Sequence, residues 1–131
     1  MCRVLLITLA YYKTIFDYEV YGYCVMPDHL HAIIRPISKY DLSFIMKMVK
    51  GSFARKMNRL AGLQGSMWQS GFYEDAIRSD EQLTTQLNYI HGNPVKGNLA
   101  PSVEKYEFSS YRQYFNPEEK GEVILEVDRF Q

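Results

Sequence analysis

Apolar residues recur along the chain at two spacings, one typical of helices and the other of strands. Segment 3–16 is apolar at every third or fourth position, which predicts a helix, although its β-branched residues leave a strand as the alternative. Segments 18–26 and 29–35 are apolar and β-prone, and the Pro27-Asp28 turn between them predicts an antiparallel hairpin. The chain is therefore expected to open with a helix and two paired strands.

A long amphipathic helix is expected next, because Asp41 can cap a run that is apolar at helical spacing as far as Leu60. The net charge of the chain is zero, yet the interval between Asp41 and Glu74 holds no acidic residue. The cationic side chains of this helix therefore make a candidate surface for a polyanion such as DNA, with an ordinary solvated face as the alternative. These side chains are Lys47, Lys50, Arg55, Lys56 and Arg59.

A further helix is expected after a loop over 62–71 and a short strand over 72–77. Ser79 or Asp80 caps this helix, and Asn93-Pro94 is expected to end it, because proline disfavours helical backbone in the residue before it. The aromatic segment after this helix, 106–115, is expected to pack back as a short helix.

Length and composition limit the possible classes of protein. The 131 residues suit one domain, which we place at 1–116, followed by an acidic tail over 117–131. Cys2 and Cys24 have neither the spacing of a zinc finger nor the density of a disulfide scaffold, so a cytoplasmic location is expected. The opening apolar run is far shorter than the roughly 20 residues that cross a bilayer, and no membrane partner is expected.

Two of the three histidines, His29 and His31, stand one residue apart in the predicted hairpin. Side chains on a strand alternate between its two faces, so both imidazoles are expected on the same face. A pair of neutral imidazoles is half of a site for a divalent metal ion.

Tyr89 and Asn93 are four residues apart on the predicted helix over 80–93 and are therefore neighbours on one face. A divalent ion held by His29, His31 and the Asn93 amide oxygen could polarise a phosphodiester for attack by a tyrosine phenolate. The alternative is that Tyr89 only packs by its ring and that Asn93 only ends the helix. His91 falls on another part of the helix, and we expect it at the surface or against DNA.

The chain resembles the single-tyrosine HUH transposases of the insertion-sequence 200/605 group. The segment YGYCVMPDHLHAIIRP resembles their histidine-hydrophobe-histidine strand. MWQSGFYEDAIRS, LNYIHGNPVKGNLA and YEFSSYRQY, in that order, resemble the branch called REP-associated tyrosine transposases. The resemblance runs from about residue 5 to residue 114 and implies an α+β, ferredoxin-like fold with an antiparallel sheet.

The resemblance also implies an activity and its residues. His29 and His31 correspond to the metal-binding histidines, Tyr89 to the nucleophile, and Asn93 to the position of a third metal ligand. The family cleaves and rejoins single-stranded DNA beside a hairpin through a 5′-phosphotyrosine intermediate, with Mg²⁺ or Mn²⁺. A prokaryotic, nucleoid-associated strand transferase is therefore the expected function.

One departure from the family pattern suggests an alternative. Family members usually begin with a further strand ahead of the first helix, which pairs with the histidine strand, and this chain starts at or just before that helix. Unpaired strand edges attract other strands, so a homodimer that shares sheet edges is one expectation. The alternative function is a shortened relative that binds hairpin or single-stranded DNA without cleaving it.

Overall fold

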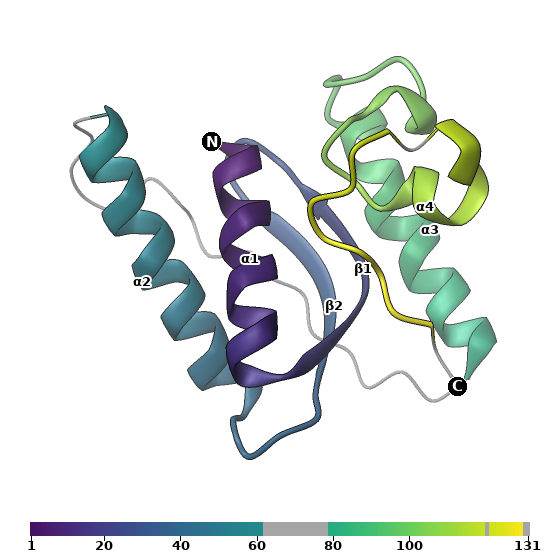
Figure 1. Ribbon diagram of the computed structural model, residues 1–131. Helices are drawn as coiled ribbons and strands as arrows, with labels where there is room; N and C mark the ends of the chain where they lie inside the picture. The colour runs from purple at the N-terminus through teal and green to yellow at the C-terminus, as the bar shows by residue number, and fades with distance from the viewer. Residues whose placement is uncertain (62–78, 120, 130–131) are drawn as a thin grey trace.

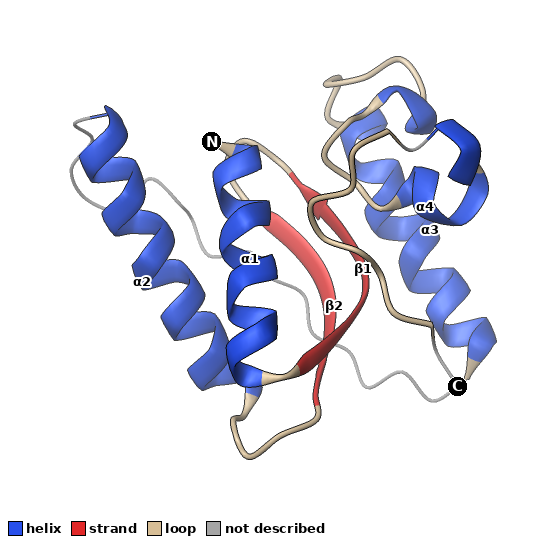
Figure 2. Ribbon diagram, viewed as in Figure 1, coloured by secondary structure: helices blue, strands red, loops and turns tan. Residues whose placement is uncertain are grey.

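The computed structural model describes residues 1–61, 79–119 and 121–129. Its fold is α+β with an antiparallel sheet, which confirms the predicted class (Figures 1 and 2). The predicted loop over 62–71 and strand over 72–77 lie outside the described residues. The elements are α1 (Cys2–Phe16), β1 (Tyr18–Val25), β2 (Leu30–Pro36), α2 (Leu42–Ala61), α3 (Asp80–Lys96), α4 (Tyr111–Phe115), and the 3₁₀ helices η1 (Val103–Lys105) and η2 (Pro117–Glu119).

The two strands form the predicted hairpin. The amide of Met26 donates to the carbonyl of His29 at 2.8 Å and closes the turn, and β2 begins one residue later, at Leu30. Cys24 lies opposite His31 in the register, and the pairing shifts between Val20 and Gly22. His29 therefore belongs to the turn, and His31 is the second residue of β2.

Helices cover both faces of the hairpin, with α1 and α2 on one side and α3 on the other (Figure 2). Because side chains alternate along a strand, Ala32 and Ile34 enter the core under α1 and α2, whereas Ile33 enters the core under α3. The second core is small and includes Leu87 and Ile90 of α3. This arrangement gives α3 its own apolar contact with the sheet.

Local sequence signals explain three of the helix ends. Asp17 adopts a left-handed conformation with φ of 57° at the end of α1, which turns the chain into β1. The carboxylate of Asp41 accepts a hydrogen bond from the amide of Phe44 at 2.8 Å, so the predicted cap of α2 is confirmed. Of the two candidate caps of α3, Ser79 is the one observed, because its hydroxyl accepts from the amide of Gln82 at 3.1 Å.

The prediction that Asn93-Pro94 ends α3 is wrong. The helix continues to Lys96, with Pro94 inside its last turn. At that place proline removes only one backbone hydrogen bond, and the ring of Pro94 is buried, which offsets the loss. The turn is closed by the amide of Gly97, which donates to the carbonyl of Asn93 at 2.8 Å.

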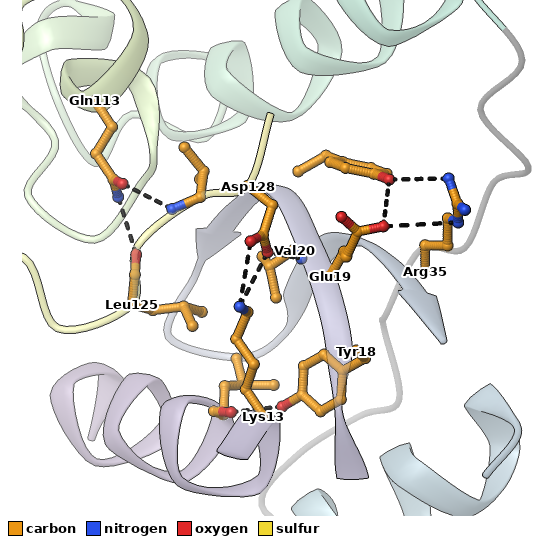
Figure 3. Close-up of polar contacts among 11 residues, drawn as sticks. Lys13, Tyr18, Glu19, Val20, Arg35, Gln113, Leu125 and Asp128 are labelled. Carbon is orange, nitrogen blue, oxygen red and sulfur yellow. Dashed lines mark hydrogen bonds and ion pairs between the residues drawn. The ribbon is translucent and has the colours of Figure 1, made fainter. Parts of the chain in front are cut away.

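Segments from the second half of the chain cover the edge of β1 that faces away from β2 (Figure 3). The amide of Val25 donates to the carbonyl of Phe108 at 2.8 Å near one end of the strand. Near the other end, Val20 and Asp128 form two hydrogen bonds. The amide of Asp128 donates to the carbonyl of Val20 at 2.7 Å, and the amide of Val20 donates to the carboxylate of Asp128 at 2.8 Å. We call residues 121–129 the C-terminal segment.

The C-terminal segment is also held by side chains. Gln113 of α4 donates to the carbonyl of Leu125 and accepts from the amide of Val127, at 3.0 and 2.9 Å. Leu125 is 1% exposed and belongs to the core under α1.

None of the described helices is both long and apolar enough to cross a membrane.

Candidate functional site

The two histidines of the hairpin lie side by side. Their ring centroids are 4.7 Å apart and the ring planes are nearly perpendicular. His31 pairs with Cys24, whose side chain belongs to the core under α3, so the histidines lie on the same face of the hairpin as α3.

Asp28 orients the first imidazole, a role that the sequence reasoning did not assign. Its carboxylate lies 2.7 Å from Nδ1 of His29, and this hydrogen bond holds the pKa of Asp28 below its usual value. A ring that donates from Nδ1 keeps a lone pair on Nε2, which is the arrangement found around histidines that bind metal ions. The signal for this role was present in the sequence, because Asp28 directly precedes His29.

His31 has the properties expected of a residue that can bind a metal ion. Its Nδ1 is buried and has no hydrogen-bond partner within the described part of the chain. Burial, with a smaller contribution from nearby His29, lowers the pKa of His31. The ring is therefore neutral at pH 7, and a neutral imidazole with an unpartnered nitrogen fits a divalent cation.

Tyr89 of α3 faces this pair. The rings of His31 and Tyr89 are edge to face, with centroids 5.9 Å apart. Tyr89 is nevertheless 53% exposed, so its phenol is accessible to a large substrate. The structure thus brings together three of the predicted site residues, from the turn, β2 and α3.

The side chain of Asn93 is hydrogen-bonded within α3. Its side-chain amide nitrogen donates to the carbonyl of Tyr89 at 3.2 Å, so the side chain lies back along α3. None of its described contacts is with a histidine. Among the described residues, no group of three or more histidine, cysteine, aspartate and glutamate side chains gathers around one point. A cation at the pair would therefore depend on the two imidazoles and on oxygen ligands such as water, an amide or phosphate.

The prediction that His91 is at the surface is wrong. His91 is 2% exposed, and its Nε2 lies 2.7 Å from the hydroxyl of Ser110. Burial lowers the pKa of His91 to about 4, so its ring is neutral near pH 7. The helical spacing explains the error, since His91 continues the buried face of α3 formed by Leu87, Ile90 and Pro94.

The five cationic side chains of α2 do not surround Tyr89. α2 lies across the hairpin from α3 (Figure 1), and the five residues differ in their surroundings. Lys56 donates to the buried hydroxyl of Thr8 on α1 at 3.1 Å, and the half-buried Lys50 has its pKa lowered by burial. The exposed members are Lys47, Arg55 and Arg59.

Comparison with known proteins identifies the class of protein to which the chain belongs. The IS200-like transposase family matches residues 4–93, well over half of the chain. The chain therefore belongs to the IS200-like transposase family.

Two curated relatives carry a more specific name. The chain is 28% identical over 108 residues to a candidate REP-associated tyrosine transposase of Haemophilus influenzae, an alignment that covers 75% of this chain and 61% of the relative. It is 30% identical over 97 residues to a REP-associated tyrosine transposase of Escherichia coli, covering 73% of this chain and 56% of that protein. This chain thus aligns with little more than half of each relative. No solved structure matches it.

Proposed function

We propose that this protein is a strand transferase that cleaves and rejoins single-stranded DNA beside a hairpin, with Tyr89 as the nucleophile. The observation that carries the proposal is the exposed Tyr89 ring 5.9 Å from His31, which is itself 4.7 Å from His29. Membership of the IS200-like transposase family supports this reading of the site.

The proposed step is an in-line displacement at phosphorus. The phenol oxygen of Tyr89 loses its proton to water and attacks the scissile phosphate, forming a bond between that oxygen and phosphorus. The bond to the 3′ oxygen breaks, and this oxygen takes up a proton from water and leaves as a free 3′-hydroxyl. The DNA remains attached to Tyr89 through its 5′ phosphate. Attack by another 3′-hydroxyl reverses the step and rejoins the strand, so no ATP is needed.

The histidine pair would hold Mg²⁺ or Mn²⁺ for this reaction. The residues fit a divalent cation because Asp28 fixes the lone pair of His29 on Nε2 and His31 has an unpartnered ring nitrogen. When bound, such a cation neutralises and orients the phosphate. Asn93 remains a proposed oxygen ligand, which would require its amide to turn away from the carbonyl of Tyr89.

Tyr89→Phe tests the proposal, because it removes one oxygen and retains the ring. We expect the wild-type protein to form a covalent adduct with a labelled single-stranded hairpin in Mn²⁺, detected on a denaturing gel, and the variant to form none while it binds the DNA equally well. Tyr11→Phe is the matched control, because Tyr11 lies on α1 and is similarly exposed, at 56%.

Two outcomes contradict the proposal. Cleavage by Tyr89→Phe with no protein-linked DNA from either form would indicate that the metal activates water. Tight binding by the wild-type protein with neither cleavage nor an adduct in any divalent metal would favour the alternative function of a hairpin-binding protein.

A further inference from the structure

The helix that carries Tyr89 approaches β1 unusually closely at Gly22. A Cβ atom placed on Gly22 would lie 2.2 Å from Cδ2 of Leu87 and 3.5 Å from the hydroxyl of Ser110. A side chain at position 22 would therefore displace α3 or force Leu87 to move. The absence of a side chain sets how near α3 stands to the strand.

His91 fixes the same helix against rotation. Its Nε2 lies 2.7 Å from the hydroxyl of Ser110, inside the protein. Ser110 is in turn attached to β1 by two bonds, because its amide donates to the carbonyl of Tyr23 at 3.0 Å and its hydroxyl accepts from the amide of Tyr23 at 3.0 Å. A hydrogen bond to Ser110 is thus in effect a bond to β1.

These contacts form a closed path through the site. β1 holds β2 in register, with Cys24 next to Tyr23 and opposite His31. His31 faces Tyr89, and Tyr89 stands two residues before His91 on α3. Side chains lie about 5–6 Å from the axis of a helix, so a rotation of about 10° shifts a side chain by about 1 Å. The bond between His91 and Ser110 is placed to resist such a rotation.

We propose that His91 and Ser110 are positioning residues for the strand-transfer reaction, holding the Tyr89 phenol in register with the histidine pair. This inference rests on the proposed function for its chemical consequence, although the placement of the Tyr89 ring can be measured without any reaction. Neither residue touches the DNA, because both are buried.

The proton arrangement is consistent with this role. The hydroxyl of Ser110 lies 3.3 Å from the carbonyl of Tyr23 and can donate to it, which leaves its lone pairs for the amide of Tyr23 and for a proton on Nε2 of His91. The remaining nitrogen, Nδ1, has no hydrogen-bond partner among the described residues. His91→Gln can supply an amide N–H near the place of Nε2, whereas His91→Leu cannot.

The first measurement is the NMR signal of the Tyr89 ring in the full chain without DNA or metal. We expect Ser110→Ala and His91→Leu to shift this signal, because the ring then moves relative to the perpendicular His31 ring. His91→Gln should retain the wild-type signal. Ser109→Ala is the control, since Ser109 is similarly buried and its hydroxyl accepts from the nearby amide of Tyr111.

The second measurement is the rate of adduct formation at saturating DNA. A misplacement of about 1 Å can lower a rate about 100-fold, and we expect Ser110→Ala and His91→Leu to fall by about 10- to 100-fold with DNA affinity unchanged. His91→Gln should restore the rate, and Ser109→Ala should leave it unaltered. A role in stability alone would instead lower the melting temperature without moving the Tyr89 signal or the rate at saturation.

An unchanged Tyr89 signal in both Ser110→Ala and His91→Leu would overturn the inference. Should His91→Leu fail to fold, the Tyr89 signal of Ser110→Ala still decides it. If the wild-type protein forms no adduct, the proposed function fails, and the NMR signals alone then show whether the pair positions Tyr89.

Discussion

Asp28 shows how much of the chemistry of the histidine pair depends on one neighbouring side chain. Without its carboxylate, the proton of His29 could occupy either ring nitrogen, and the lone pair that faces a cation would not be fixed. Burial lowers the pKa of His31, which favours its neutral ring. The two proposed metal ligands thus differ in what orients them and in how far they are buried.

We therefore expect Asp28→Ala to weaken Mn²⁺ binding by about 10- to 100-fold, the usual effect of removing a carboxylate that orients a metal-bound histidine. Isothermal titration calorimetry of the full chain measures this, with His31→Ala as the variant expected to lose binding almost completely. Glu107→Ala serves as a control for the removal of an exposed carboxylate elsewhere. Equal affinities of Asp28→Ala and the wild-type protein would contradict the assigned role.

Single-residue roles were the hardest to predict from the sequence. The predicted proximity of His29 and His31 is observed, but only His31 lies on β2 while His29 lies in the turn, so the alternation of side chains along a strand does not by itself explain it. The side chain of Asn93 bonds back to the carbonyl of Tyr89 within α3, one of several local options open to an asparagine, and the partner of His91 is Ser110, which lies 19 residues further along the chain. Even so, the buried spacing of Leu87, Ile90 and Pro94 was a usable sign that His91 lies inside.

The positions of helices and strands were predicted much better than the roles of single residues. The hairpin and α2 follow from local patterns that tertiary contacts reinforce, and the capping role of Asp41 is confirmed. α3 runs past its expected end, with Pro94 buried inside its last turn. On α2, cationic side chains that look equivalent in the sequence differ in the structure. Lys56 is hydrogen-bonded to Thr8, whereas Lys47, Arg55 and Arg59 are exposed.

This division predicts the salt dependence of DNA binding. We expect the triple variant Lys47→Gln, Arg55→Gln, Arg59→Gln to lower the slope of log affinity against log salt by about 2, because each phosphate contact on a single strand contributes roughly 0.7. Fluorescence anisotropy with a labelled hairpin at several salt concentrations measures the slope. Lys56→Gln is the control and should change it little. An unchanged slope in the triple variant would place the DNA path away from α2.

For the molecule as a whole, the C-terminal segment joins parts of the chain that are far apart in sequence. Asp128 binds both the amide of Val20 and the ammonium group of Lys13, the latter at 3.1 Å, and both side chains of the ion pair are more than two-thirds buried. Because this segment and Phe108 occupy the outer edge of β1, a dimer that shares sheet edges would have to use β2.

We expect Asp128→Ala to lower the free energy of unfolding by about 1–3 kcal/mol, because the Val20 amide and Lys13 lose their partner in a partly buried place. Urea denaturation followed by circular dichroism measures the change. Glu122→Gln is the control. Glu122 also lies in the C-terminal segment and pairs with Arg3, which is on α1 like Lys13, but both side chains of this pair are more than half exposed. Such a pair contributes about 0–1 kcal/mol. Equal losses in the two variants would contradict the argument.

The bond between Val20 and Asp128 also bears on how the protein forms during translation. The two residues are 108 positions apart. At roughly 5–20 residues per second, a ribosome needs on the order of ten seconds to add that much chain. Throughout that interval the part of the outer edge of β1 around Val20 is without its partner. The protein therefore passes through a stage, on every ribosome, at which the hairpin can pair with foreign strands, and chaperones that shield nascent chains are expected to matter for its yield.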